Sequence, residues 1–224
     1  MFIGHFAVAL AAKKAVPQTS LGTLTLSAQW VDLVWPVFLL LGLEHVRIDP
    51  GNTVVTPLDF YDYPLTHSLA GSLGWSVALG LVYFALRRFS RGAWVVGAAV
   101  FSHWFLDALT HRPDLALYPG SHTFVGLGLW NSLAGSVAVE FAMLAVGSVL
   151  YFSSTKARDG VGRFAAAALI AVLAILYVAS LVGPPPPSPR ALAFVSLGAW
   201  LFVAWAYWAD RHREAKAVSR ASSH

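Results

Sequence analysis

The stretch RGAWVVGAAVFSHWFLDALTHRPD, residues 91–114, joins an apolar run long enough to cross a bilayer to three ionisable side chains spaced four apart. These side chains are His103, Asp107 and His111. A charge at mid-bilayer costs roughly 2.5–3.5 kcal/mol even on the insertion scale that gives the lowest cost. Such residues are therefore usually paired with other polar groups and have a function. Spacing of four places all three on one stripe of a helix, where imidazole and carboxylate groups can hold a metal ion.

The composition indicates a membrane protein independently of this stretch. Apolar residues make up 57% of the 224 residues, and charged residues only 12%. Soluble domains carry about 25% charged residues, about twice the fraction in this chain. The length of 224 residues therefore fits one membrane domain better than two soluble ones. The chain has no cysteine, which excludes a disulfide framework and a thiolate metal site. The basic residues behind the net charge of +4 are explained by membrane topology, as described below. We therefore expect no nucleic-acid partner.

Six apolar windows approach the roughly 20 residues that a spanning helix needs. They lie at about 26–43, 67–86, 92–110, 124–152, 164–183 and 191–209. The first is the weakest prediction, because it is short and holds Asp32 and Pro36. The predicted fold is therefore an all-α polytopic bundle of about six transmembrane helices.

A seventh apolar segment, FIGHFAVALAA at residues 2–12, is too short to cross a bilayer. No positive charge precedes it, unlike a signal peptide, so we expect it to be retained. Lys13 and Lys14 follow it. The sequence predicts a half-inserted or re-entrant helix here, and a full span stays open as an alternative.

Most of the 15 Lys and Arg residues fall on alternate connections between the windows. The positive-inside rule then places the C-terminus in the cytoplasm and the connections 44–66 and 111–123 outside. We predict two regions, a metal-site-bearing membrane core at 1–152 and, at 153–224, two C-terminal spans with a basic cytoplasmic tail. The two C-terminal spans carry no charged residue before Asp210, which is typical of scaffold helices.

The membrane-embedded polar inventory is short: His5, Asp32, His67, His103, Asp107, Asn131 and Glu140, with His111 and Asp62 at the outer edge. Each also has a purely structural interpretation. An isolated carboxylate can bond a hydroxyl on a neighbouring helix, a single histidine can be packed in the core, and an HxxxD pair can be a hydrogen bond along one helix.

Nitrogen and oxygen donors without sulfur suit zinc, and also manganese or iron. We predict His67, His103 and Asp107 as the first candidates for metal ligands, and Asp32 and His5 as the next ones. A catalytic ion lowers the pKa of its bound water towards 7, and a spare carboxylate serves as general base. The candidates for such catalytic roles are Glu140, Asp32 and His111.

Straight helices separate these groups in depth by 1.5 Å per residue, too far to share one ion. Tilt, or breaks at Pro36, Gly71 or Gly74, can bring several of them level. A column of polar groups is also typical of a proton or ion path, so a small ion- or proton-coupled transporter is the alternative function. A membrane scaffold without catalytic activity is a third class.

Five stretches carry a resemblance to a known family: MFIGHF, AQWVDLVWP, YDYPLTHSL, SHWFLDALTHRPDLALYPG and GLGLWNSLAGSVAVE. They resemble the bacterial YdjM-like family of inner-membrane proteins, described as membrane-bound metal-dependent hydrolases. The resemblance covers about residues 1–150. Where the family often shows PDxD, this chain has DLVWP and keeps one carboxylate.

The resemblance implies a polytopic helical fold in a bacterial inner membrane and a metal site formed by His5, Asp32, His67, His103 and Asp107. The long connection 44–66 carries the aromatic residues Phe60, Tyr61 and Tyr63, and loops of this length are usually lids or binding loops. A site in the bilayer beneath such a loop predicts an amphipathic substrate, such as a lipid or lipid-linked (phospho)ester.

Overall fold

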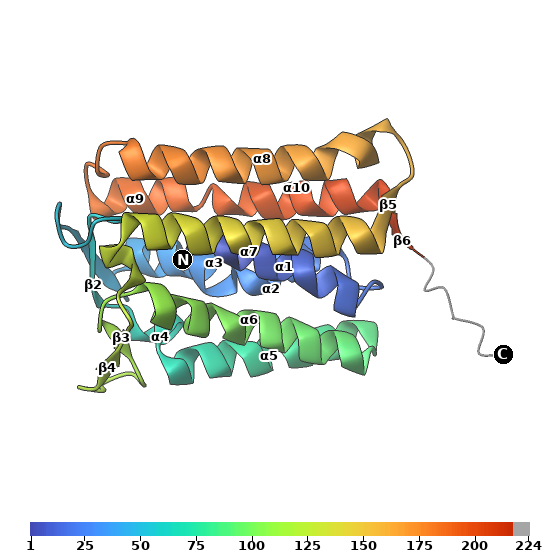
Figure 1. Ribbon diagram of the computed structural model, residues 1–224. Coiled ribbons are helices and arrows are strands. Elements are labelled where there is room, and N and C mark those ends of the chain that lie inside the picture. The colour runs from blue at the N-terminus through green and yellow to red at the C-terminus, as the bar shows by residue number, and fades with distance from the viewer. Residues whose placement is uncertain (217–224) are drawn as a thin grey trace.

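The computed structural model describes residues 1–216 and shows a bundle of helices with short two-stranded sheets at its two ends (Figure 1). Five apolar segments are long enough to cross a membrane. They are α5 (Leu69–Arg87), α6 (Ser90–Thr110), α7 (Leu133–Ser154), α8 (Gly160–Val182) and the pair α9 (Pro189–Ser196) and α10 (Ala199–Arg211). The bent pair α2 (Leu21–Ala28) and α3 (Trp30–Leu41) raises the number of spans to as many as six. The predicted all-α architecture of a multi-pass membrane protein is confirmed.

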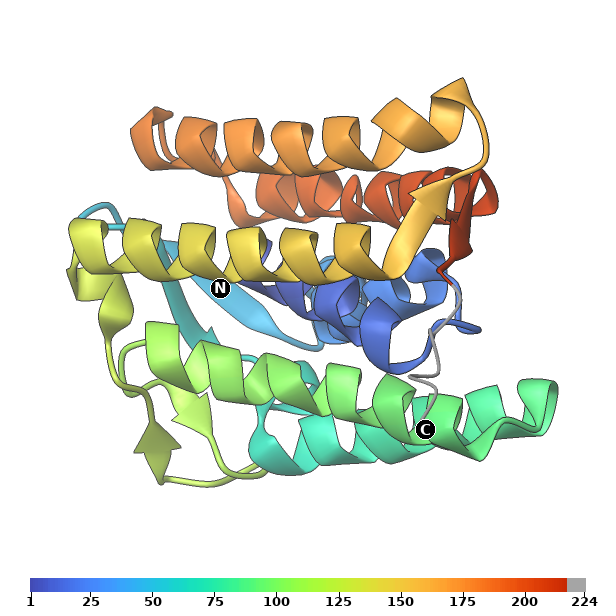
Figure 2. The ribbon, with the colours of Figure 1, turned by 45° about the vertical axis from the view of Figure 1, so that its right-hand side comes forward.

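The helices lie in layers (Figures 1 and 2). The helices α8 to α10 form one side, α5 and α6 form the other, and α1 (Ile3–Ala15) lies between them beside α2. Large apolar side chains point outward from the spans, among them Leu81, Trp94 and Val182, each more than half exposed. An apolar exterior of this kind suits lipid contact.

Helix α1 begins inside the bundle and does not cross it (Figure 1). Ile3, Phe6 and Leu10 are buried in the main apolar core. The helix lies so close to α7 that a Cβ at Gly147 would be 2.5 Å from the carbonyl oxygen of Ala7. Its other end is fixed by an ion pair between Lys13 and Asp210, 2.8 Å long. The prediction of a short helix that does not span agrees with this placement.

Two helix breaks in the first region lie at positions other than those predicted, and a third separates α9 from α10. The first separates α2 from α3 at Gln29 with a bend of 53°. The second lies at Ser68, where α4 (Pro64–His67) ends and the Ser68 hydroxyl caps α5 by accepting the N–H of Gly71. Pro36 lies inside the continuous helix α3, and Gly74 inside α5. The side-chain cap at Ser68 stabilises a new helix start, which a glycine alone does not supply.

The fourth predicted window began too early. Residues 124–132 form strand β4 (Phe124–Val125) and a 3₁₀ turn at Leu129–Asn131, and α7 starts at Leu133. The Ser132 hydroxyl caps α7 by accepting the N–H of Gly135. Asn131 lies in the 3₁₀ turn before α7, just outside the candidate span Leu133–Ser154.

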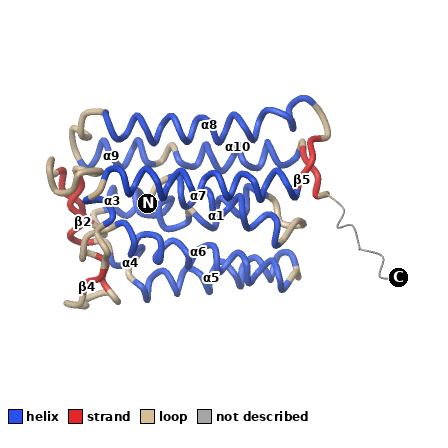
Figure 3. The backbone as a smooth tube through the Cα atoms, in the orientation of Figure 1, coloured by secondary structure: helices blue, strands red, loops and turns tan. Residues whose placement is uncertain are grey.

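Two hairpin-like pairs lie at one end of the bundle, which we call the sheet end (Figure 3). They are β1 (His45–Ile48) with β2 (Leu58–Asp62), and β3 (Leu115–Ala116) with β4. At the opposite end β5 (Thr155–Ala157) pairs with β6 (Arg213–Ala215). Most of the described basic residues lie in segments at that opposite end, the basic end: Lys13, Lys14, Arg87, Arg88, Arg91, Lys156, Arg158, Arg163, Arg211, Arg213 and Lys216. Arg47, Arg112 and Arg190 are the described exceptions. Arg220 and the end of the predicted basic tail lie outside the described residues.

The two predicted regions share one apolar core. Ile3 and Leu144 from the first region pack in the same cluster as Leu169, Leu173 and Ala206 from the second. The C-terminal spans therefore support α1 and α7 directly.

Candidate metal centre

Five predicted ligands converge from four separate elements into one buried cluster. His103 and Asp107 come from α6, His67 from the end of α4, Asp32 from the first turn of α3 and His5 from the first turn of α1. Four of the five side chains are at most 6% exposed, and Asp32 is 34% exposed. The structure brings together the whole predicted ligand set.

Donor atoms of two histidines, His67 and His103, lie close to the carboxylate oxygens of Asp32 and Asp107. The Nε2 atom of His67 lies 3.3 Å from Asp32 Oδ1 and 3.8 Å from Asp107 Oδ2. The Nε2 atom of His103 lies 3.5 Å from Asp32 Oδ2 and 3.1 Å from the same Asp107 Oδ2. Ligands arranged tetrahedrally at about 2.1 Å from a zinc ion lie about 3.4 Å from one another. The four separations are close to that value, and within the described residues two groups of three have ligand atoms within 4.8 Å of one another: Asp32, His67 and His103, and His5, His103 and Asp107.

A backbone contact fixes the orientation and tautomer of His103. Its Nδ1–H donates to the carbonyl oxygen of Ala28 at 2.9 Å. This carbonyl is free because α2 ends at Ala28. The Nε2 atom therefore carries the lone pair, it has no hydrogen-bond partner, and it faces two carboxylates. A buried nitrogen that faces two carboxylates needs positive charge there, and either a proton on the imidazole or a bound metal ion supplies it.

His67 is held in the same way through a hydroxyl relay. The Thr66 hydroxyl donates to Glu44 Oε2 at 2.7 Å, so it accepts the Nδ1–H of His67 at 2.6 Å. Glu44 also accepts the backbone N–H of Thr66 at 2.8 Å. Burial raises the pKa of the Glu44 carboxyl, against the lowering influence of these contacts. The relay leaves Nε2 of His67 free to bind a cation.

His111 lies directly after α6 and beside Asp107. Its Nδ1 atom lies 3.0 Å from Asp114 Oδ1, and its Nε2 atom lies 4.0 Å from Asp107 Oδ1. The Tyr63 hydroxyl donates to the same Asp114 oxygen at 2.8 Å. Burial raises the pKa of Tyr63 well above its ordinary value of 10, so this phenol stays a donor. Burial also lowers the pKa of His111, against the raising influence of Asp114.

His5 contacts Asp107 from the other side of the carboxylate. Its Nε2 atom lies 3.1 Å from Asp107 Oδ1, and the main-chain nitrogen of Met1 donates to the same oxygen at 2.6 Å. The imidazole rings of His5 and His103 are stacked, with centroids 3.5 Å apart and an interplanar angle of 4°.

Glu140, predicted as a general base, lies at the edge of the cluster and holds the start of α1. Its two carboxylate oxygens accept the backbone N–H groups of Phe2 and Gly4, at 2.8 and 2.7 Å. A carboxylate at the N-terminus of a helix is stabilised there by the exposed N–H groups. The structure thus gives Glu140 an anchoring position for the helix that carries His5.

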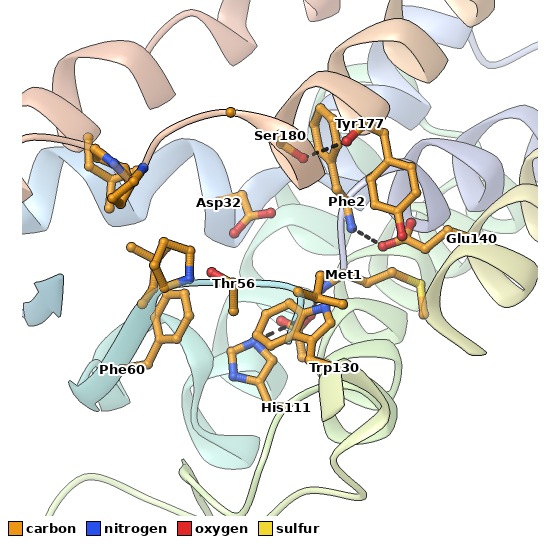
Figure 4. A pocket seen from close by; sticks show the side chains of 18 of the residues that line it. Met1, Phe2, Asp32, Thr56, Phe60, His111, Trp130, Glu140, Tyr177 and Ser180 are labelled. Carbon is orange, nitrogen blue, oxygen red and sulfur yellow. Dashed lines mark hydrogen bonds and ion pairs between the residues drawn. The ribbon is translucent and has the colours of Figure 1, made fainter. Parts of the chain in front are cut away.

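A cavity of about 380 Å³ opens onto the cluster (Figure 4). Its polar wall includes Asp32, His67, Asp107 and His111. The remaining wall is mainly apolar and comes from the 44–66 connection, from α8 and from the proline turn after it: Val55, Pro57, Leu58, Phe60, Ala179, Pro184, Pro185, Pro186 and Leu192. The C-terminal region, predicted as scaffold, therefore lines the cavity.

The residues that orient the imidazoles were not predicted from the sequence. Glu44, Thr66, Asp114 and Ala28 all support a ligand histidine, yet none stands at a recognisable spacing from it except Asp114, three residues after His111. Glu44 is 1% exposed although it sits in a polar connection. The burial of Glu44 is what identifies it as a supporting residue, and only the tertiary structure shows that burial.

Comparison with protein-family models, with curated proteins and with solved structures finds no match. The chemistry of the cluster therefore rests on its own geometry.

Proposed function

We propose that this protein is a membrane-embedded, metal-dependent hydrolase that acts on an amphipathic ester, such as a lipid or lipid-linked (phospho)ester. The observation that carries the proposal is the convergence of ligand atoms from Asp32, His67 and His103, which lie within 4.8 Å of one another, beside the buried Asp107. The histidine-rich donor set favours zinc, with manganese or iron as alternatives.

A divalent ion held there supplies a bound water of lowered pKa and polarises the bond under attack. Residues of the chain orient the two imidazoles and accept the proton of the water. The Ala28 carbonyl and the Thr66 relay keep both imidazoles in the tautomer that binds a cation through Nε2. Asp32 lines the cavity and is the more exposed of the two aspartates, so it can accept a proton from water there.

The cavity supports an amphipathic substrate. Polar and titratable groups occupy one wall, and apolar side chains with a run of prolines occupy the other. Within residues 1–216, no Lys or Arg lines this cavity. Charge on a substrate phosphate would therefore be balanced by bound metal rather than by side chains.

The location proposed is a bacterial inner membrane. Most of the described basic residues lie at one end of the bundle, and α4, which carries His67, lies at the opposite, sheet end (Figure 1). By the positive-inside rule the basic end and the C-terminus face the cytoplasm. The cavity then faces the periplasmic half of the membrane.

Metal analysis of the purified protein tests the proposal. We expect stoichiometric zinc, manganese or iron in the wild type and its loss in the double variant His103→Ala, Asp107→Ala. Chelation should lower the melting temperature, because an ion that binds only the folded state stabilises it by about 2.7 kcal/mol at 100 times its dissociation constant. Hydrolysis of micellar ester and phosphoester lipids should follow metal content. A wild type without metal overturns the proposal.

The transporter alternative needs polar groups through the whole depth of the membrane. The described titratable groups of the cluster instead gather at one level, which supports hydrolysis over transport. Proton or ion flux in liposomes that is lost in Asp32→Asn, with no ester hydrolysis, would favour the transporter. If no substitution in the cluster changes anything but stability, a scaffold role is favoured.

A further inference from the structure

A surface groove runs between α5 and α6, which form one side of the bundle (Figures 1 and 2). Its volume is about 560 Å³. Where the two backbones approach, a Cβ at Gly80 would lie 3.2 Å from the Ala93 carbonyl oxygen, so small residues form the floor. The walls are larger side chains, of which Leu81 and Trp94 are 64% and 80% exposed. Helix α5 is also the least buried of the five candidate spans, so the groove is open to lipid.

The lining of the groove is apolar along most of its length. Among the described residues it carries no charged side chain, and its polar side chains are the hydroxyls of Ser76 and Ser90. The Ser76 hydroxyl donates to the Gly97 carbonyl oxygen at 2.7 Å, so it offers no free donor to a ligand. Ser90 lies at the first position of α6, at the basic end. An apolar chain is therefore the ligand group that fits the body of the groove.

Three exposed arginines, Arg87, Arg88 and Arg91, lie in the α5–α6 turn at the basic end of the groove. The guanidinium of Arg88 lies 5.9 Å from the ring centroid of Phe84, which lines the groove. Arg91 precedes Trp94 by one turn of α6, so the two share a side of that helix. The ion pairs described at the basic end lie on other segments, so within residues 1–216 these arginines have no carboxylate partner. Their charge complements an anionic group at the end of an apolar chain.

We propose that this groove binds an anionic phospholipid from the leaflet at the basic end, with its headgroup at Arg88 and Arg91 and one acyl chain between α5 and α6. Trp94 lies one turn inside α6, at the depth where indole rings prefer the membrane interface. A second copy of the chain fits the groove less well. Copies in one membrane share an orientation, so their arginines would meet at the same level and repel. The inference does not depend on the proposed hydrolase activity, because no member of the metal cluster lines the groove.

Native mass spectrometry of the full chain in detergent tests the headgroup. The protein is titrated with equimolar phosphatidylglycerol and phosphatidylcholine of the same acyl chains. Phosphatidylcholine carries the same phosphate with a compensating positive charge, so we expect phosphatidylglycerol to bind at least about tenfold more tightly. The double variant Arg88→Gln, Arg91→Gln should weaken phosphatidylglycerol about fivefold for each arginine removed and leave phosphatidylcholine unchanged.

Two further variants test the position. Arg163→Gln is the matched control, because Arg163 is an exposed arginine at the basic end on α8, with its guanidinium 5.4 Å from the ring centroid of Phe164. It should bind both lipids as the wild type does. Ala98→Leu places a larger side chain at an exposed position of the groove lining, so it should weaken both lipids with no change in melting temperature.

Each outcome decides the inference. Equal affinity for the two lipids, or phosphatidylglycerol binding that the double arginine variant leaves unchanged, overturns the headgroup assignment. Phosphatidylglycerol binding that Ala98→Leu leaves unchanged overturns the groove as the acyl-chain site. A wild-type dimer that Ala98→Leu converts to a monomer assigns the groove to a second copy and also overturns the proposal. A preference for phosphatidylglycerol that falls in both tests, and not in Arg163→Gln, confirms it.

Discussion

The half of the bundle that holds the cluster contains several interrupted helices beside the continuous α6, whereas the half that supports it is built around the continuous α7 and α8. Helix α1 starts inside the bundle, α2 and α3 are separated at Gln29, and α4 and α5 are separated at Ser68. By contrast, α7 and α8 run without a break for 22 and 23 residues. The candidate ligands come from the interrupted half.

The difference shows what a helix break contributes to a site inside a membrane. Each candidate ligand outside α6 lies within three residues of a helix end or break: His5 near the start of α1, Asp32 just after Gln29 and His67 just before Ser68. A break changes the direction of the chain, so side chains that a straight helix would separate in depth become level. It also frees backbone groups, and the Ala28 carbonyl that orients His103 is one of them.

The largest expected effect comes from the residue that all the donors share. Asp107→Asn replaces an anionic oxygen by an amide nitrogen, so we expect complete loss of bound metal and of metal-dependent hydrolysis. Metal analysis by mass spectrometry measures the first, and release of product from micellar lipid measures the second. The matched control is Asp62→Asn, a half-exposed carboxylate paired with His45 at the sheet end. Metal retained by Asp107→Asn contradicts the assignment of Asp107 as a ligand.

A smaller loss should follow from the relay that orients His67. Glu44→Gln places an amide against Thr66, whose N–H and hydroxyl both donate to the present carboxylate. Loss of such a supporting contact typically weakens metal affinity about 10–100-fold. Competition with a chelator of known affinity measures the change. Unchanged affinity would mean that the Thr66 relay has no part in holding His67.

The contact between the two halves can be tested with a pair of glycines. A Cβ at Gly147 would lie 2.5 Å from the Ala7 carbonyl, so Gly147→Ala should push α1 away from α7 at a cost of about 1–3 kcal/mol. Because α1 carries His5, metal binding should weaken as well. Gly74→Ala is the control, since nothing lies within 4 Å of its Cβ and alanine favours the helix by up to about 1 kcal/mol. Thermal unfolding in detergent compares them, and equal melting temperatures would contradict the tight α1–α7 packing.

The smallest effect belongs to the basic end of the continuous half. The His212 ring and the Gly162 N–H bond Asp159 and lower the pKa of its carboxyl below the ordinary 3.8. A lowered carboxyl pKa stabilises the fold above pH 3.8, and this contribution is lost as the pH falls through the folded-state value. Asp159→Asn should therefore melt slightly below the wild type at neutral pH, and the two should converge in acid, with metal content unchanged. A difference that persists in acid would show that ionisation of Asp159 is not its cause.

The fold class followed from the sequence because apolar length and charge distribution are local properties. The windows at 67–86, 92–110 and 164–183 match α5, α6 and α8 to within a few residues. The positions of the breaks did not follow. Pro36, which removes a backbone donor, lies in an unbroken helix, whereas Ser68 ends one because its hydroxyl caps the next.

The candidate ligands followed from the sequence because a charged or imidazole side chain in an apolar segment is expensive, and so it stands out wherever it occurs. Only the tertiary structure decided how those side chains are used. It placed His5 in a ring plane parallel to that of His103, divided the two oxygens of Asp107 between two donor sets, and brought the buried Glu44 behind His67. These relations depend on the directions of separate helices, which no spacing along one chain specifies.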